Sequence, residues 1–165
     1  MAVCNIITYP DPLLKSESTE ITEITPELLI LIQNLIDTMS ESEHSTGIAA
    51  PQIGSTVRLA VADASRRRKP SLNHGRLILL NPCIIQHEGS VTSREGCMSI
   101  PEYTGNVNRA GKIVVQYYDE KFERRVIEAE GFESVLLQHE IDHLDGILFI
   151  DRVISRRTDL FRRKK

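Results

Sequence analysis

The stretch QHEIDHL at residues 138–144 decides how the rest of the chain is interpreted. His139 and His143 are four residues apart, so on a helix both imidazoles lie on one side and can bind one metal ion. Glu140 lies about 100° around such a helix, where its carboxylate can reach a metal-bound water without binding the metal itself. The motif therefore predicts a hydrolytic metal site on a helix. A surface or core helix that carries chance histidines is the alternative.

Two histidines leave a catalytic metal short of a ligand, because such zinc sites usually have three protein ligands and one water. No His or Glu follows His143, so the third ligand has to come from upstream. The best candidate is Cys97 in the stretch EGCMS (95–99), because a thiolate is a strong ligand for zinc and ferrous iron. Cys83 and Cys4 are rival ligands. A buried free cysteine is the other interpretation of Cys97.

Composition and charge limit the class of protein. The chain has 165 residues, of which 41% are hydrophobic and 26% are charged, as is typical of one soluble globular domain. The formal net charge of −3 disfavours a dedicated nucleic-acid binder. No apolar run approaches the ~18 residues that span a membrane, and the first residues do not form a secretory signal. Three cysteines favour a reducing compartment. We expect one catalytic domain over residues 1–165, cytoplasmic, with no membrane or DNA partner.

Secondary-structure patterns predict an α+β domain. An amphipathic helix is expected from Pro26 to near Ser40, with Thr25 as its N-cap. A second helix is expected over Ser134–Leu144, closed by Gly146. Short apolar runs predict strands at residues 57–62, 76–80, 83–86, 112–118 and 122–130. This order of elements predicts mostly antiparallel strands.

The charge is unevenly distributed along the chain. Residues 151–165 hold seven basic and two acidic residues, a net charge of +5. Two interpretations stay open: a basic tail that meets RNA or another acidic surface, and a solvated, frayed helix.

Three blocks of sequence together resemble the peptide deformylase family. They are GIAAPQIG at 47–54, EGCMS at 95–99 and QHEIDHL at 138–144, and they occur in the family's order. The start, YPDPLL at 9–14, is also similar, so the resemblance covers nearly the whole chain. It implies antiparallel strands packed around a central C-terminal helix that carries the His-Glu-x-x-His motif. It also implies a hydrolase that removes the N-formyl group from the initiator methionine of newly synthesised polypeptides and releases formate.

The resemblance further implies which residues hold the metal. The ligands of one divalent ion would be Cys97, His139 and His143. The ion in the cell would be Fe(II), with zinc, nickel and cobalt as alternatives. Glu140 would be the general base and would later hand its proton to the leaving amine.

Other residues receive roles at the substrate. Formamide hydrolysis develops negative charge on the carbonyl oxygen, and we expect the Gln52 side-chain amide and the backbone N–H of Met98 to stabilise it. Gly47 and Gly96 would let the peptide backbone approach closely, and Gly47 is counted with the catalytic group as well. The substrate can add as a short strand through main-chain hydrogen bonds. The residues expected to line the methionine pocket are Ile48, Val135 and Leu136.

A few neighbouring residues carry weaker expectations. Ser45 stands where the family usually has a glycine, so the conformation of that loop is an open question. Gln138 and Asp142 flank the histidines, and surface or structural roles are favoured for them over orienting the imidazoles. Glu95 and Arg109 are expected to pair across the site.

Two other classes of function stay open beside the deformylase hypothesis. A zinc endopeptidase shares the helix motif but needs a third ligand after the helix. A binding protein with a structural metal predicts a closed site of four ligands. For the deformylase the partners would be N-formylmethionyl nascent peptides, with a ribosome contact through residues 151–165. A bacterial cytoplasm fits best, because formyl-methionine initiation is bacterial.

Overall fold

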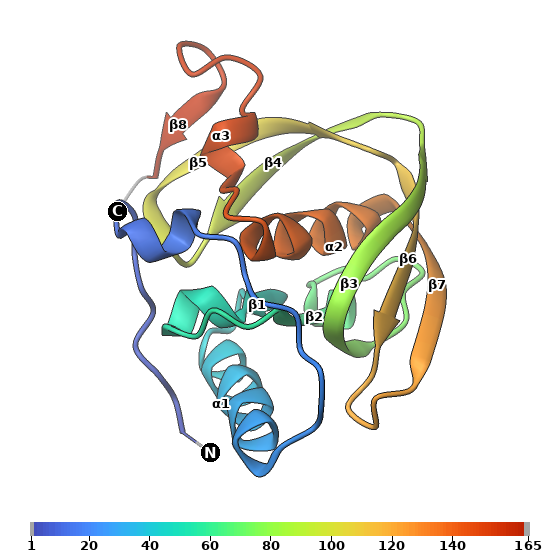
Figure 1. Ribbon diagram of the computed structural model, residues 1–165. Helices are drawn as coiled ribbons and strands as arrows, with labels where there is room; N and C mark the ends of the chain where they lie inside the picture. Colours follow the sequence, from blue (N-terminus) through green and yellow to red (C-terminus); the bar gives the residue numbers. More distant parts are fainter. Residues whose placement is uncertain (1, 164–165) are drawn as a thin grey trace.

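The computed structural model describes residues 2–163 (Figure 1). The elements in chain order are the 3-10 turn η1 (Pro12–Lys15), α1 (Pro26–Glu41), β1 (Gly47–Ala49), the 3-10 turn η2 (Ala50–Ile53), β2 (Leu59–Asp63), the 3-10 turn η3 (Ala64–Arg66), β3 (Arg76–Glu88), β4 (Val91–Cys97), β5 (Ile100–Arg109), β6 (Lys112–Tyr118), β7 (Arg124–Glu130), α2 (Gly131–Leu144), α3 (Phe149–Arg152) and β8 (Leu160–Arg162). Within residues 2–163, no helix combines the length and apolar character that crossing a membrane requires.

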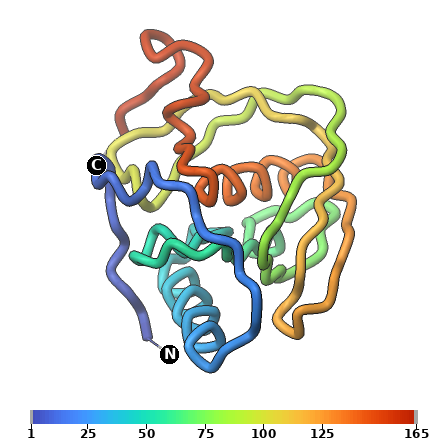
Figure 2. The backbone as a smooth tube through the Cα atoms, in the orientation of Figure 1, coloured from blue at the N-terminus to red at the C-terminus, as the bar shows by residue number. Residues whose placement is uncertain are grey.

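The strands form two sheets in which every pair of neighbours is antiparallel. The larger sheet has the order β1-β2-β3-β6-β7 and the smaller one the order β4-β5-β8. The chain leaves the larger sheet after β3 and returns to it in β6, so β4 and β5 form one hairpin between them. Figure 2 shows this part of the chain passing over α2 and back. The predicted α+β fold with mostly antiparallel strands is confirmed.

Helix α2 lies between the two sheets (Figure 1). It begins directly after β7 at Gly131, which has a left-handed φ of +60. Eleven of its fourteen residues are buried, including both histidines of the motif and Glu140. Because polar groups are costly to bury without partners, these side chains need partners or a function inside the protein.

Strand β2 lies between the two long helices, and its side chains explain how closely α2 approaches the larger sheet. Its larger side chains, Leu59 and Val61, pack in a core cluster with the apolar face of α1. Its alternate residues, Ala60 and Ala62, face α2, where Ala60 contacts the cluster of Leu144. Small residues on that face let the motif helix sit close to β1 and β2. Helix α1 has the predicted N-cap, since Thr25 accepts a hydrogen bond from Leu28 N, and it ends within a residue of the predicted end.

Strand β3 differs from its prediction, because Asn81-Pro82 lies inside one strand and does not divide two. The pairing with β6 shifts register between Leu80 and Cys83, which is a bulge. Asn81 has a positive φ of 51, and its side-chain amide bonds both the N–H and the C=O of Ile21 at 2.8 Å. The bulge thus accommodates Pro82 within the strand, although proline cannot donate a hydrogen bond to the neighbouring strand.

The basic C-terminal segment also differs from one expectation. Its described part is not a frayed helix, because after the short α3 the chain turns and adds β8 to β5. The register pairs Tyr103 with Arg162 and Gly105 with Leu160. Lys164 and Lys165, the last residues of the predicted tail, lie outside the described residues.

Candidate metal centre and active site

Three possible metal ligands meet where α2 faces the end of β4. Cys97 is the last residue of β4, and His139 and His143 project from successive turns of α2. Their ligand atoms all lie within 4.8 Å of one another, and Cys97 Sγ is 3.3 Å from His143 Nε2. The structure therefore brings together the two histidines of the motif and the upstream cysteine. The rival Cys83 is exposed on β3, and Cys4 lies beside α1, where its N–H donates to Thr38 Oγ1.

The ionisation of Cys97 suits a metal ligand. Burial raises the pKa of the Cys97 thiol, but the adjacent His143 and His139 imidazoles outweigh burial and hold it well below its usual range. The thiolate is the form that binds metal ions. One thiolate and two imidazoles, all buried, form a three-ligand set of the kind that leaves a fourth position open in catalytic sites. The residues present therefore fit the metal that the motif predicts.

Glu140 lies beside these ligands with part of its carboxylate unused. Its side chain is 2% exposed, and Oε1 has no hydrogen-bond partner among the described residues. Burial raises the pKa of Glu140. On the other side, a Cβ added to Gly47 would overlap Glu140 Oε2, so the glycine is what leaves room for the carboxylate. A buried, unpartnered carboxylate is costly to fold around and is typical of a group that handles protons in catalysis.

The predicted oxyanion donors both lie next to Cys97. Gln52 is buried in η2, and its Oε1 accepts a 2.9 Å hydrogen bond from Ala49 N, which fixes which way the amide points. Its Nε2 is thereby directed at Cys97 Sγ, 3.5 Å away, and at Ser99 Oγ, 3.1 Å away. Met98 follows the cysteine in the turn between β4 and β5, and its side chain packs against the α1 core cluster.

Glu95 orients the first histidine, a role that the sequence analysis missed. Its Oε1 is 2.9 Å from His139 Nδ1, which leaves the other ring nitrogen, Nε2, for the metal. Arg109 grips the same carboxylate through Nε and Nη2, each at 2.8 Å, so the expected Glu95–Arg109 pair is confirmed. Burial raises the pKa of Glu95, but the hydrogen bonds from Arg109 and His139 prevail and lower it to about 2. Glu95 precedes Cys97 by two residues. Side chains two residues apart in a strand point to the same face, so this spacing could have placed Glu95 beside the candidate ligand.

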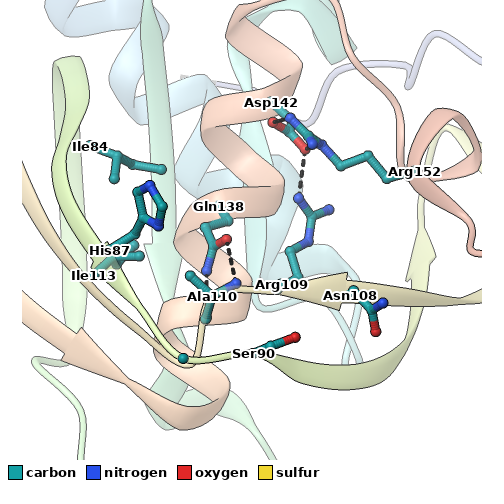
Figure 3. Close-up of a pocket in the computed structure, with 11 residues that line it drawn as sticks. Ile84, His87, Ser90, Asn108, Arg109, Ala110, Ile113, Gln138, Asp142 and Arg152 are labelled. Atoms are coloured by element: carbon teal, nitrogen blue, oxygen red, sulfur yellow. Dashed lines mark hydrogen bonds and ion pairs between the residues drawn. The ribbon is translucent and has the colours of Figure 1, made fainter.

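The charged chain continues on the far side of Arg109. Arg109 Nη1 donates to Asp142 Oδ2 at 2.6 Å, and Arg152 binds the same carboxylate at 2.6 and 2.9 Å. Figure 3 shows Asp142 between the two guanidinium groups at the edge of a pocket of about 430 Å³. Gln138 bonds the backbone N–H and C=O of Ala110 in the same view. Among residues 2–163, no hydrogen bond joins the side chain of Gln138 or Asp142 to an imidazole, in agreement with the structural roles expected for them.

The loop at Ser45 is held without backbone strain. Among the described residues other than glycine, only Asn81 and Phe122 have a positive φ, so Ser45 does not adopt a glycine conformation. Ser45 Oγ donates to Gly47 O at 3.1 Å, and Arg66 Nε donates to Ser45 O at 2.8 Å. The serine therefore anchors the start of β1 through hydrogen bonds.

The residues expected to contact substrate lie on three elements. Ile48 is fully buried on β1 and packs with α1. Leu136 packs in the core cluster between α2 and the larger sheet, whereas Val135 is buried one turn before His139. Gly96 lies on β4, next to the Arg163 guanidinium. Strands β1 and β4 are each the edge strand of a sheet, and both border the motif on α2.

Comparison with known proteins agrees with this geometry. The family model described as polypeptide deformylase matches residues 3–159. The chain belongs to the polypeptide deformylase family. A peptide deformylase of Syntrophobacter fumaroxidans is 41% identical over 99% of this chain and 94% of its own, and one of Thermodesulfovibrio yellowstonii is 42% identical over 99% and 97%.

Solved deformylase structures have the same fold. The enzyme from Legionella pneumophila matches with a TM-score of 0.85 at 34% identity, covering 92% of this chain and 86% of the other. The enzyme from Thermotoga maritima matches with a TM-score of 0.85 at 31% identity, covering 94% and 100%. Deformylases are metal-dependent hydrolases that remove the N-formyl group from nascent peptides. The predictions of family, fold and enzyme class are thus confirmed.

Proposed function

We propose that this deformylase holds one divalent metal ion through Cys97, His139 and His143 and uses Glu140 as the general base for hydrolysis of N-formylmethionyl peptides. The observation that carries the proposal is the buried carboxylate of Glu140, whose unpartnered Oε1 lies beside the convergent ligand set. We further propose that residues 1–165 act as one catalytic domain, because β1, η2, β4 and α2 all contribute to this site.

The ligand chemistry limits the bound ion to a few divalent transition metals and does not select one of them. When bound, a divalent ion supplies a Lewis acid for the formyl oxygen and lowers the pKa of water. One thiolate and two imidazoles suit Fe(II), zinc, nickel and cobalt. We propose Fe(II) in the cell. Metal analysis of protein purified without oxygen tests this choice, and zinc as the sole bound metal would contradict it.

Glu140 moves the proton in this proposal. Its unpartnered Oε1 accepts a proton from the attacking water and then returns it to the methionine nitrogen as the formyl C–N bond breaks. Formate and a free amino terminus are the products. Burial keeps the carboxylate away from bulk water, and Gly47 keeps its position free of side-chain atoms.

Gln52 and Met98 are proposed to stabilise the negative charge that develops on the formyl oxygen. The Gln52 carbonyl is already fixed by Ala49 N, so its NH₂ group is the end that remains to donate toward the reacting centre. The backbone N–H of Met98 comes directly after the ligand Cys97. Loss of one such donor costs about 3 kcal/mol of transition-state stabilisation.

The substrate is proposed to enter between the two edge strands. Edge strands carry unpaired backbone groups, so a short extended peptide can bind there through its main chain, largely independent of its sequence. Gly47 on β1 and Gly96 on β4 would allow close approach. Ile48, Val135 and Leu136 are proposed to line the methionine pocket, and the buried position of Val135 beside the ligands is the strongest support for it.

A contact with the ribosome is proposed for the basic C-terminal segment. Its loop between α3 and β8 exposes Arg156 and Arg157. Among residues 2–163, Arg156 has one acidic neighbour, Asp151 at 3.7 Å, and Arg157 forms no ion pair. Ribosomal RNA is an acidic surface that such side chains can meet. We place the enzyme in a bacterial cytoplasm, because formylated chains are made there and the relatives it matches are bacterial proteins. Co-sedimentation with ribosomes, compared between the wild type and the Arg156→Ala/Arg157→Ala variant, tests the contact.

Substrate choice tests the activity itself. We expect formate release from formyl-Met-Ala-Ser and no cleavage of the same peptide without the formyl group. Internal cleavage of unformylated peptides would indicate an endopeptidase and would contradict the proposal.

A further inference from the structure

Strand β4 presents different residues on its two faces. Glu95 and Cys97 point toward α2, where they contact His139 and His143. Arg94 and Gly96 alternate with them and point to the opposite face, which we name the outer face of the smaller sheet. The outer face therefore borders the same edge of β4 as the metal centre but lies on its solvent side.

Two guanidinium groups gather on the outer face. Arg94 donates from Nε to Thr104 Oγ1 at 3.0 Å and lies 3.9 Å from the centre of the Phe161 ring on β8. Arg163 follows β8 and reaches back across the sheet, so that its guanidinium fills the space that a side chain at Gly96 would need. The C-terminal strand thus adds one arginine and positions the other.

The described residues supply no acidic side chain that pairs with either guanidinium. Within residues 2–163, neither Arg94 nor Arg163 has an acidic group within 4.0 Å. Glu102 on β5 accepts the backbone N–H of Arg163 through its own backbone oxygen at 2.7 Å, and its carboxylate forms no ion pair with either arginine. Two partly free cations next to Gly96 favour an anionic group at that point.

The direction of the substrate along β4 is fixed by the metal centre, provided that the proposed function is correct. The formyl group has to reach Cys97, the last residue of β4, so the peptide can follow the free edge only back toward Arg94. Its side chains alternate between the two faces. The methionine turns inward, toward Val135 on α2, so the second residue turns to the outer face.

We propose that Arg163 and Arg94 recognise an acidic side chain at the second residue of the formylated peptide. The C-terminal strand then acts in substrate selection, with peptides of the type formyl-Met-Glu and formyl-Met-Asp processed most efficiently. Ion pairs between exposed groups are weak, so each arginine contributes roughly a two- to fivefold preference.

The test compares formyl-Met-Glu-Ser, formyl-Met-Gln-Ser and formyl-Met-Lys-Ser, because Glu and Gln have the same shape. We expect kcat/KM to fall in that order at low ionic strength, with the difference in KM. The preference of Glu over Gln disappears near 1 M salt, where the Debye length is about 3 Å. Arg163→Gln and Arg94→Gln each lower the Glu/Gln ratio, and the double variant brings it to about one.

The matched control is Arg162→Gln. It removes the same charge from the neighbouring position of β8, which faces the other side of the sheet opposite Tyr103. The ratio should stay at the wild-type value. An equal loss in Arg162→Gln would mean that only net charge matters, and this would overturn the proposal, as would equal kcat/KM for the Glu and Gln peptides.

Binding measurements separate this inference from the proposed function. Calorimetric titration of the Glu140→Gln variant with the three peptides measures recognition without turnover. Tighter binding of the Glu peptide supports the role of the arginines, and equal affinities overturn it. Absence of formate release from every peptide by the metal-loaded wild type would instead contradict the proposed function.

Discussion

The Oε1 atom of Glu95 lies 2.9 Å from Nδ1 of His139, and this contact joins the metal centre to a buried chain of charges. Arg109 holds Glu95 in place with two hydrogen bonds, and Asp142 holds Arg109. The ring of His139, a candidate metal ligand, is thus oriented by a chain of side chains that lie behind it. Single substitutions in this chain should therefore change metal affinity, the free energy of unfolding and the sensitivity to acid.

Glu95→Gln should weaken metal binding. The amide has half the hydrogen-bonding oxygen atoms of the carboxylate and no charge, so His139 loses its fixed orientation. Changes to such supporting groups typically cost 10–100-fold in metal affinity. Competition with a chelator measures the effect, and Glu128→Gln on exposed β7 is the control that should match the wild type. Unchanged affinity in Glu95→Gln would show that His139 is held by other contacts.

Arg109→Ala should destabilise the metal-free protein by about 3–5 kcal/mol, because it leaves the Glu95 and Asp142 carboxylates buried without their partner. Urea denaturation gives the free energy of unfolding. The matched control is Arg125→Ala, which breaks the exposed ion pair with Asp119 at 2.9 Å and should cost less than about 1 kcal/mol. Equal losses in the two variants would contradict the buried role of Arg109.

Glu95 should also give the metal-free protein a specific sensitivity to acid. Burial raises the pKa of Glu95, but Arg109 and His139 bring it to about 2, against 4.5 in an unfolded chain. The folded protein binds this proton less readily, so the stabilisation is complete above pH 4.5 and is lost as the pH falls toward 2.

The variant Glu95→Gln isolates this contribution, since its side chain does not titrate. The gap in unfolding free energy between wild type and variant should shrink by at most about 1.4 kcal/mol per pH unit within that interval. Urea titrations at several pH values measure the gap. A gap that does not change with pH would mean that the carboxylate titrates normally.

Gly47→Ala should impair turnover more than Gly96→Ala. A Cβ at residue 47 overlaps the Glu140 carboxylate, which is buried, whereas a Cβ at residue 96 meets the flexible end of the exposed Arg163. Displacing a catalytic group by about 1 Å can cost 10²-fold in rate. We expect Gly47→Ala to lose kcat while its metal content stays at the wild-type value. A larger loss of kcat in Gly96→Ala would reverse the assignment.

The helices and the grouping of the three candidate metal ligands could be predicted from the sequence because their signals are local. Helix α1 repeats apolar residues at helical spacing behind a Thr25-Pro26 start, and α2 carries both histidines on one side. Cys97 was the best candidate for a third ligand upstream of the helix, and the structure places it beside His139 and His143. The pairing of Glu95 with Arg109 was expected as well, although its purpose, to hold His139, was not.

The smaller sheet was not accessible in the same way. Strand β4 reads Val-Thr-Ser-Arg-Glu-Gly-Cys, with few apolar residues, because its outer face meets solvent and its inner face meets the polar site. Strand β8 has three residues and exists only through its pairing with β5. Asn81-Pro82 indicated a break in β3, whereas the contact of Asn81 with Ile21, sixty residues away, allows a bulge. Long-range partners of this kind leave no local pattern.

The role of Glu140 is tested most sharply by formate release from formyl-Met-Ala-Ser, measured with enzyme that is purified without oxygen and loaded with Fe(II) and compared with Glu140→Gln. We expect rapid release by the wild type and a loss of at least about 10²-fold in kcat for the variant, with equal metal content in both proteins. Release by Glu140→Gln at the wild-type rate would contradict the role of Glu140 as base. Absence of release from folded, metal-loaded wild type would contradict the activity.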